Sequence, residues 1–397
     1  MSQSFDALVI GAGPGGGATA LRLARGGWRV AVVERKTFPR RKVCGEYLSA
    51  TNLPLFESLG VAAAFRECAG PPVTHVGFYA GSAVLRADLP KPAGTSEWGR
   101  ALSREHLDTL ILRNAADAGA TVFQPYSAIG LSRDHGLYCL RVESSVGDVA
   151  ELSAPVVVAA HGSWETGPLP TQLPRAKLRA SDLFGFKAHF ADSRLPEGLM
   201  PLLAFPGGYG GMVHCERGKA SISFCLRRDV LTRLRAARAG DAAEVAFGHL
   251  MRKCRGVCDA LEGAERVGAW LSTGPIRPGI RVRADGGLFR VGNAAGEAHP
   301  VVAEGISMAM QAGGLVAERL IIWKQAGGRV DALPAVGTDY AAAWRRSFAP
   351  RLRASRAIAH WAMRPSAVAV SLPAMRLFPG LLTWGARLSG KATRIGG

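Results

Sequence analysis

The chain has 397 residues, 48% of them hydrophobic and 20% charged, which is typical of a globular protein with two or three lobes. Its net charge of +18 comes mostly from arginines spread along the sequence, without a basic-aromatic RNA motif or a helix-turn-helix pattern, so we expect no nucleic-acid partner. The sequence shows no secretory signal, no bilayer-length apolar run, no CxxC pair among seven cysteines and no set of zinc ligands, which predicts a cytoplasmic protein with reduced thiols and no metal site.

The N-terminal region has the pattern of a strand-turn-helix-strand unit. Residues 7–10 form a short apolar run that predicts a buried parallel strand. A glycine-rich turn follows at residues 11–16, then a helix with an apolar face, and a second buried strand at residues 30–33 that ends on Glu34. This arrangement is typical of a dinucleotide-binding unit.

Each glycine of this turn has a separate expected purpose. Gly11 allows the tight turn, Gly13 lets the backbone approach a pyrophosphate, and Gly16 lets the helix pack closely on the strand. The helix N-terminus offers unpaired N–H groups to the phosphates. Glu34 is placed to accept hydrogen bonds from ribose hydroxyls.

Two further segments make the pattern specific. Residues 38–49 form a loop whose Arg40, Arg41 and Lys42 are available for phosphate or carboxylate, and a helix with Ser103 as its expected N-cap runs to about residue 119. The loop reads P-R-x-K-x-C-G-E-x-L-S and the helix opens S-R-x-x-L-D. Together with the N-terminal unit they resemble the FAD-dependent geranylgeranyl reductase-like family, within the group of aromatic-hydroxylase-type flavoprotein monooxygenases and flavin-dependent halogenases.

The resemblance implies FAD as the cofactor. It implies that Arg104 contacts the FAD and that Cys44 lies at the active site, as the loop cysteine does in the reductases of the family. From the residues alone, Arg104 could equally be a surface helix arginine and Cys44 a thiol buried in the packing of the loop.

The middle of the chain predicts strands, and one of them departs from the family. Strands are expected at residues 121–123, 137–142 and 156–160. The last ends on His161-Gly162, where members of the family usually have Asp-Gly. His161 therefore removes a carboxylate and adds a titratable base.

The next four expected strands alternate apolar with polar or small residues, which predicts an antiparallel sheet with one wet face, similar to the substrate-covering sheet of these flavoproteins. They are residues 184–190, 202–205, 209–215 and 220–226, and they carry Lys187, His189, Tyr209 and His214, which we expect to be solvated or satisfied by neighbours.

Two family signatures are missing from this sheet. The Tyr-x-Trp-x-Phe stretch of the archaeal lipid reductases is replaced by Tyr209-Gly-Gly211-Met-Val213, which weakens an isoprenoid-reductase interpretation. The Trp-x-Trp-x-Ile-Pro stretch of the halogenases is absent from the sequence, so halogenation ranks third.

A second family signature lies near residue 300. A strand at residues 288–291 leads into a glycine-rich loop, and a helix begins near Gly305. In the family this loop holds the ribityl chain of FAD, and the helix dipole faces the flavin ring and stabilises negative charge on it. Asn293 replaces a usual Asp, and Ala303 replaces a usual Gly, which makes the loop less free.

The motifs and the resemblance give a set of expected site residues. The catalytic candidates are Cys44, His299 and Pro300; His299 is the acid/base candidate, with a solvent-facing loop histidine as the alternative. The expected cofactor-binding residues are Gly11, Gly13, Pro14, Gly15, Gly16, Glu34, Arg35, Arg41, Cys44, Gly45, Arg104, Gly162, Gly292, Asn293, Gly296, Gly305 and Ile306.

We expect an α/β fold built around a Rossmann-like, p-hydroxybenzoate-hydroxylase-like FAD-binding domain. This discontinuous domain takes residues 1–70, 101–165 and 276–330. An inserted antiparallel sheet at residues 71–100 and 166–275 would bind substrate, and residues 331–397 would form a helical C-terminal region.

The end of the chain is basic and apolar. No acidic residue follows Asp339, whereas arginines recur up to Arg387, followed by Lys391 and Arg394. Residues 340–397 could rest on an anionic membrane, which would make the protein peripheral at the inner face, or could form two helices that cap an apolar substrate tunnel. The second interpretation is favoured.

Three functions stay open. The first is a monooxygenase of secondary metabolism that hydroxylates a hydrophobic aromatic or polyketide-like molecule through a flavin hydroperoxide. The second is an ene-reductase or dehydrogenase that transfers hydride through flavin N5. The third is a non-catalytic or peripheral membrane flavoprotein. Because a second GxGxxG is absent from the sequence, NAD(P)H would visit transiently, or a flavin-reducing partner would supply electrons.

Overall fold

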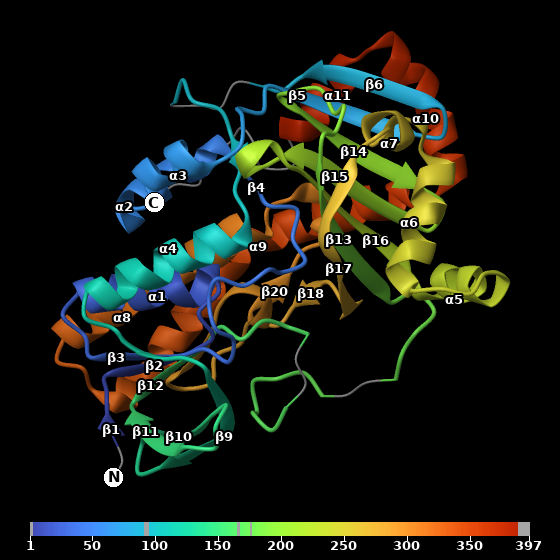
Figure 1. Ribbon diagram of the computed structural model, residues 1–397. Helices are drawn as coiled ribbons and strands as arrows, with labels where there is room; N and C mark the ends of the chain where they lie inside the picture. The colour runs from blue at the N-terminus through green and yellow to red at the C-terminus, as the bar shows by residue number, and fades with distance from the viewer. Residues whose placement is uncertain (1–2, 91–94, 165–166, 175–176, 388–397) are drawn as a thin grey trace.

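Two large β-sheets dominate the fold (Figure 1). The computed structural model describes residues 3–90, 95–164, 167–174 and 177–387. The first sheet is parallel and has the strand order β19-β12-β2-β3-β8. Its strands are β2 (Ala7–Ile10), β3 (Val30–Val33), β8 (Thr121–Phe123), β12 (Val156–Ala159) and β19 (Leu288–Arg290).

Both faces of this sheet are covered, as its continuous apolar strands predict. Along β2, Ala7 and Val9 pack against three helices, whereas Leu8 and Ile10 pack against a smaller sheet on the opposite face. The helices are α1 (Pro14–Arg25), α4 (Arg104–Asp117) and α8 (Gly305–Gln325). The smaller sheet contains β1 (Gln3–Ser4), β9 (Tyr126–Asp134), β10 (Leu137–Ser144) and β11 (Val149–Ala154).

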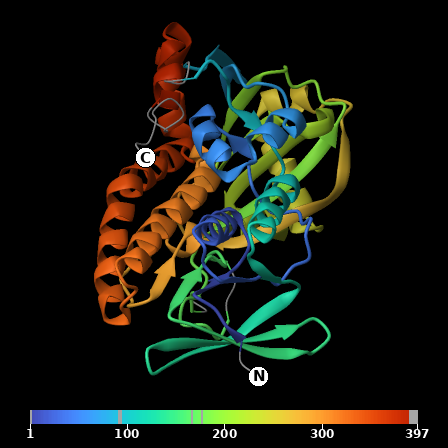
Figure 2. The same ribbon diagram turned by 90° about the vertical axis from the view of Figure 1, so that its left-hand side faces the viewer.

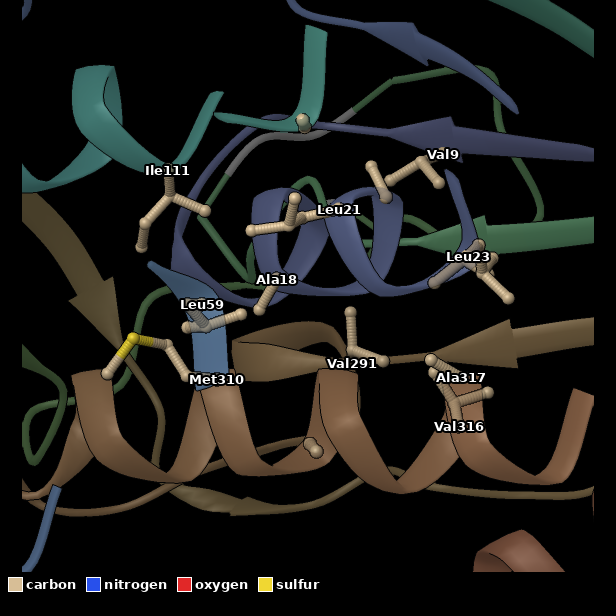
Figure 3. Packing of buried hydrophobic residues seen from close by; sticks show 14 of the residues in the cluster. Val9, Ala18, Leu21, Leu23, Leu59, Ile111, Val291, Met310, Val316 and Ala317 are labelled. Carbon is tan, nitrogen blue, oxygen red and sulfur yellow. The ribbon is translucent and has the colours of Figure 1, made fainter. Parts of the chain in front are cut away.

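Helices α1 and α8 approach each other closely in this core (Figure 3). A Cβ atom on Gly313 would lie 2.6 Å from the backbone oxygen of Gly15, so the contact requires glycine. Around it, Ala18 of α1 and Leu59 lie near Met310 of α8 (Figure 3). This packing fixes where both helices begin, and both begin at the site described below.

The second sheet has seven strands in the order β17-β13-β16-β15-β14-β5-β6. It is antiparallel except between β14 and β5, which pair in parallel. The four strands expected from the sequence, β13 to β16, pair antiparallel as expected; the parallel ladder involves β5, which is not among the expected strands. Its strands are β5 (His75–Ala80), β6 (Ala83–Asp88), β13 (Leu183–Ala191), β14 (Leu199–Phe205), β15 (Gly208–His214), β16 (Ala220–Arg227) and β17 (Glu265–Ile276).

The expected wet face of this sheet is covered. Leu203 and Ile222 pack beneath α5 (Arg228–Ala237), α6 (Ala242–Lys253) and α7 (Arg255–Ala260), which come from the basic helical stretch after β16. The opposite face carries Phe78 and Tyr209 and is turned toward a cavity and the C-terminal helices. The polar alternation therefore reflects a cavity wall, which sequence periodicity cannot distinguish from a solvated face.

Shorter elements connect the two sheets. They are β4 (Tyr47–Leu48), β7 (Arg100–Ala101), β18 (Gly279–Ile280), β20 (Gly296–Glu297), α2 (Leu53–Leu59), α3 (Ala62–Cys68) and the 3-10 turns η1 (Ala50–Asn52), η2 (Glu216–Gly218), η3 (Gly292–Ala294), η4 (Pro300–Val302) and η5 (Val330–Ala332).

Three helices end the described chain: α9 (Leu333–Ala362), α10 (Pro365–Leu377) and α11 (Gly380–Ala386). Figure 2 shows them in red and orange along one side of the molecule. Among the described residues, no single helix has the length and apolarity to cross a membrane; α10 and α11 reach both only when taken together, and they are bent by 115°. Lys391 and Arg394 of the basic tail lie outside the described residues.

The architecture confirms the expected α/β fold with a Rossmann-like part, an inserted sheet and a helical C-terminal region. One local detail differs. Ser103 is the N-cap residue of α4, but its side chain makes no capping hydrogen bond and instead lies 2.9 Å from Nδ1 of His106.

Candidate active site

A single large cavity joins the two sheets. It has a volume of about 1,140 Å³ and reaches from the glycine-rich turn to the seven-stranded sheet and the C-terminal helices. Small-molecule sites typically occupy roughly 300–1,000 Å³, so this cavity has room for a cofactor and part of a second molecule. Every expected catalytic and cofactor-binding residue lines it except Gly16 and Gly296.

The two exceptions are glycines with a packing purpose. A Cβ atom on Gly16 would lie 1.9 Å from the oxygen of Gly11, which fits the close packing expected of Gly16. A Cβ atom on Gly296 would lie 2.3 Å from the ring of Trp344. Gly296 therefore makes room for α9, a requirement that the motif alone does not reveal.

The glycine-rich turn presents its backbone to the cavity. Gly11 has a φ of +102°, a conformation that side-chain-bearing residues rarely adopt. Gly13 is the N-cap of α1, makes no side-chain capping bond and leaves space for a ligand beside it. The N-terminal N–H groups and the positive dipole end of α1 thus form an anion-binding position.

Charged side chains surround this position in a connected chain. The Glu34 carboxylate accepts a hydrogen bond from the backbone N–H of Ala12 at 2.9 Å, and Arg40 lies 3.7 Å from both Glu34 and Asp108. Asp108 in turn accepts two hydrogen bonds of 2.7 Å from Arg104. The sequence offers three cations in this loop, Arg40, Arg41 and Lys42. The contacts with Glu34 and Asp108 distinguish Arg40 from the other two.

Arg104 is buried, with 8% of its surface exposed, so it is not a surface helix arginine. Burial alone would lower the pKa of its guanidinium, but Asp108 and the nearby Cys44 raise that pKa above its ordinary value. Its Nη2 lies 3.5 Å from the position that a Cβ of Gly13 would occupy. A fixed positive charge therefore stands beside the phosphate position.

These features fit FAD. The turn and Arg104 would hold the pyrophosphate, Glu34 the adenosine ribose, and Gly292, Asn293 and the start of α8 the ribityl chain and flavin ring. Arg35 and Arg41 also line the cavity, and Arg41 donates a 3.3 Å hydrogen bond to the backbone of Ala269 on the second sheet.

Asn293 is explained by a buried neighbour, Glu297. The Asn293 amide donates to the Glu297 carboxylate at 3.0 Å, and Ser163 and Trp164 donate to the same group at 2.9 and 2.8 Å. Burial raises the pKa of Glu297. An Asp at position 293 would place a second carboxylate there, which a buried site disfavours. Glu297 had no assigned role in the sequence; its only signal was an acid within a loop of small residues.

His161 lines the cavity, and both of its ring nitrogens have hydrogen-bond partners, so it is not a free base. Its Nδ1 lies 3.0 Å from the oxygen of Gly162 and its Nε2 lies 2.8 Å from the hydroxyl of Thr171. Burial lowers its pKa to about 4, so the imidazole is neutral near pH 7.

His299 and Tyr209 form a pair inside the cavity. The Tyr209 hydroxyl lies 3.2 Å from Nδ1 of His299, and both residues line the cavity. His299 is buried, so the alternative of a solvent-facing loop histidine is wrong. Burial, helped by the nearby His360, lowers the pKa of His299 to about 4, and burial raises the pKa of Tyr209 well above its ordinary value. The pair is therefore neutral, with Tyr209 able to donate a proton.

The loop that carries His299 is held in place. Its backbone N–H donates to the Ser355 hydroxyl of α9 at 3.2 Å. Ala303 closes the η4 turn with a φ of +56°, in the left-handed region where the family usually has glycine. Pro300 and Gly305 line the cavity on either side of it.

Buried polar contacts of Glu46 hold the loop that contains Cys44 against β13. Glu46 has a φ of +62° and forms ion pairs with Lys187 and with His189, the latter at 2.8 Å. Burial would raise the pKa of Glu46, but the Lys187 ammonium and the hydrogen bond with His189 lower it to about 2. Lys187 and His189 are thus satisfied, as expected, although buried rather than solvated.

The same carboxylate lies near a third potential metal ligand. Glu46, His189 and Cys215 offer atoms within 4.8 Å of one another. The Lys187 ammonium already neutralises Glu46, and burial raises the pKa of the Cys215 thiol, which disfavours the thiolate that a metal would need. We therefore interpret these residues as a structural link, the Glu46–Lys187 ion pair, between the Cys44 loop and β13.

The far end of the cavity is apolar and belongs largely to the C-terminal helices. Trp361 of α9 stacks on Phe78 of β5 with ring centroids 5.2 Å apart. Met375 of α10 and Leu382 and Trp384 of α11 also line the cavity. The C-terminal helices therefore cover an apolar extension of the site.

Comparison with known proteins agrees with this geometry. Residues 4–329 match the FAD binding domain family. The menaquinone reductase of Mycolicibacterium smegmatis is 28% identical over 365 residues, 87% of this chain and 80% of that protein. The Mycobacterium tuberculosis menaquinone reductase is 29% identical over 175 residues, and this match spans only 41% of that protein.

Solved structures show the same fold at low identity. A myxobacterial chondrochloren halogenase superimposes with a TM-score of 0.77 at 20% identity and covers 97% of this chain and 91% of the other. A geranylgeranyl bacteriochlorophyll reductase-like protein from Thermoplasma acidophilum has a TM-score of 0.70 at 18% identity, with coverage of 99% and 94%.

Proposed function

The chain belongs to the FAD binding domain family and is an FAD-dependent oxidoreductase, and from this premise we propose that it reduces a carbon–carbon double bond in a hydrophobic, prenyl-type substrate. The observation that carries the proposal is the buried Tyr209–His299 pair, because reduction of an alkene needs a proton donor as well as a hydride. Sequence reasoning ranked hydroxylation first. The Tyr209 phenol is protonated near neutral pH and lines the cavity beside His299, so it is available as the proton donor that reduction needs.

FAD that has first been reduced, by NAD(P)H or a flavin-reducing partner, would supply the hydride to one carbon of the double bond. Tyr209 would give its hydroxyl proton to the other carbon, so that the substrate gains two hydrogens. Neutral His299, 3.2 Å away, would orient the phenol and return a proton to it. His360 is exposed, and its ring centroid lies 5.9 Å from that of His299, which offers a path for protons from solvent.

The substrate class follows from the walls of the cavity. Trp361, Met375 and Leu382 offer apolar surface that suits an isoprenoid chain. Similarity over most of the chain to proteins named menaquinone reductase and digeranylgeranylglycerophospholipid reductase supports this class. We also propose NAD(P)H as a transient electron donor, since the sequence holds one dinucleotide turn of this kind.

The test is a single turnover followed by mass spectrometry. Purified holoenzyme is reduced with dithionite without oxygen and mixed with menaquinones and prenylated glycerolipids. We expect a product two mass units heavier that keeps this mass after air has reoxidised any quinol, because only a reduced carbon–carbon bond retains the two hydrogens. Failure to form it with any of these substrates, together with a product sixteen units heavier under oxygen, would overturn the proposal.

A matched pair of variants tests the proton donor. Tyr209→Phe should lower the single-turnover rate by about 10²–10⁴-fold, the range typical of general acid catalysis, while flavin content is unchanged. Tyr79→Phe is the control, because Tyr79 is equally buried but does not line the cavity. Equal rates in both variants would remove Tyr209 from the proposed mechanism.

A monooxygenase is the second candidate, and one observation favours it. Gly210 and Gly211 line the cavity without side chains, which leaves width for a ring-shaped substrate. The same turnover experiment under labelled oxygen distinguishes it, since only hydroxylation incorporates the label.

A further inference from the structure

Helix α10 carries apolar residues on its solvent-facing side. Ala369, Val370, Pro373, Ala374 and Leu377 follow one another at helical spacing, and all are exposed. The exposed fractions of Val370 and Leu377 are 83% and 75%. The opposite side of α10 is also apolar and packs against the second sheet. A surface helix of a soluble protein normally has a polar outer face, and nothing among the described residues covers this apolar one.

The exposed apolar side chains continue into the next helix. Phe378 is 66% exposed, and Leu381 and Trp384 of α11 are 44% and 60% exposed. We call Val370, Leu377, Phe378, Leu381 and Trp384 the C-terminal apolar face. Figure 2 shows that these helices lie at the outer edge of the molecule.

This face adjoins the cavity. Leu381 and Trp384 are exposed to solvent and also line the cavity, so they stand at its rim. Val370, Leu377 and Phe378 do not line it. A molecule that passes the rim would reach the apolar end of the cavity without crossing the polar end, where FAD would bind.

Positive charge borders the C-terminal apolar face. Arg364, Arg376 and Arg387 are exposed on or beside α10 and α11, and no acidic residue follows Asp339 in the sequence. Asp88 of β6 lies beside α11, where its backbone oxygen accepts a hydrogen bond from Thr383. Exposed apolar side chains bordered by arginines complement a bilayer with anionic head groups.

We propose that α10 and α11 lie in the surface of an anionic lipid bilayer and admit a membrane-dissolved substrate at the rim formed by Leu381 and Trp384. The docking itself stands on the C-terminal apolar face; the passage of substrate rests on the proposed function. The 115° bend between the helices suits a segment that lies in the interface, with the apolar side chains among the acyl chains and the arginines at the head groups.

Flotation of the holoenzyme with vesicles tests the docking without any substrate. We expect flotation with phosphatidylcholine–phosphatidylglycerol vesicles and much less with phosphatidylcholine alone. Leu377→Gln/Phe378→Gln should lower the partition coefficient by at least about tenfold, because two exposed apolar side chains no longer enter the acyl region. Val146→Gln/Val149→Gln, at exposed valines near the turn between β10 and β11, should leave it unchanged.

A second pair of replacements tests the charge. Arg364→Gln/Arg376→Gln should weaken flotation on anionic vesicles by about tenfold or more and reduce its salt dependence. Flavin content and Tm, measured on each variant, report whether it is folded. Loss of alkene reduction with retained flotation would contradict the proposed function and leave the docking standing.

Two results would overturn the proposal. The first is wild-type protein that does not float on anionic vesicles, or floats equally with the Leu377→Gln/Phe378→Gln replacement. The second is a dimer in light scattering that this same replacement dissociates, together with no flotation, which would assign the face to a second copy of the chain.

Discussion

Gly13 and Gly16 stand three residues apart in one turn, yet a side chain would meet different surroundings at each. At Gly13 a Cβ has its nearest neighbour at 3.5 Å and the backbone φ is −65°, so an L-residue fits. At Gly16 a Cβ would lie 1.9 Å from the oxygen of Gly11. The two positions therefore separate cofactor binding from folding.

We expect Gly13→Val to give folded protein without FAD, because its methyl groups fill the position of the pyrophosphate. Gly16→Ala should instead cost several kcal/mol, about 2–4, through the clash in the core, and lower the soluble yield. Absorbance at 450 nm and circular dichroism of the two purified variants check this. Flavin retained in Gly13→Val would show that the turn does not bind the cofactor.

The buried histidines make stability depend on pH. His161 and His299 each have a pKa lowered from 6.5 to about 4, so in this window the unfolded chain binds protons that the native chain does not. Stability is therefore full above about pH 6.5 and falls with acidification, by about 1.4 kcal/mol per pH unit for each histidine. Glu46, whose pKa is lowered to about 2, adds its loss only below about pH 4.5.

Urea unfolding of the holoenzyme between pH 6.5 and 4.5 should show this slope, and His161→Gln should reduce it. His135→Gln is the control, because the His135 side chain is 95% exposed and should leave the slope unchanged. An unchanged slope in His161→Gln would mean that His161 is protonated in the native protein.

Some residue roles follow from the sequence and others only from neighbours. The turn of Gly11, Gly13 and Gly16 could be interpreted because its spacing is local. Asn293 and Tyr209 could not. Tyr209 and His299 lie 90 residues apart in sequence and are brought together by the fold. Glu297 is close to Asn293 in sequence, but the sequence does not show that the loop turns the two side chains toward each other.

At the scale of elements, the Glu46–Lys187–His189 cluster ties the Cys44 loop to β13. Glu46 adopts a left-handed φ of +62°, which costs a non-glycine residue about 1–3 kcal/mol and persists because the ion pairs hold it. The loop that faces the flavin position is thus fixed by the substrate sheet. Sequence periodicity located β13 but gave no sign of this link.

Removing one partner of the Glu46–Lys187 ion pair should reveal the free-energy cost of burying the other charge alone. We expect Lys187→Met to lower the free energy of unfolding by about 3–5 kcal/mol, because the buried Glu46 loses its ammonium partner and keeps its contact with His189. The double variant Lys187→Met/Glu46→Gln should recover part of this loss. Chemical denaturation of the single and double variants measures the difference, and additive losses would show that the two groups do not interact.

At the scale of the whole molecule, the chain order of strands and helices predicted the two-sheet architecture, because alternating strand and helix patterns leave few topologies. Helices over an apolar tunnel are the favoured interpretation of residues 340–397, and α9 to α11 form this roof. The parallel β14–β5 ladder is not expected from the sequence, because it depends on contacts between distant segments. An apolar helix face in a sequence also does not say whether it meets protein, ligand or lipid, so the exposed face of α10 could not be assigned either.

The roof makes cavity length a testable property. Leu382 of α11 is partly buried and lines the apolar end, so Leu382→Trp should shorten the space without touching the nucleotide end. We expect the kcat/KM for long-chain prenyl substrates to fall by about tenfold or more, while that for short-chain analogues changes little, because added volume in an apolar pocket discriminates by size. A series of menaquinones with increasing chain length measures this ratio. Equal flavin content in the wild type and in Leu382→Trp would confirm that only the substrate end of the cavity has changed. An equal loss of kcat/KM at every chain length would place the substrate chain elsewhere.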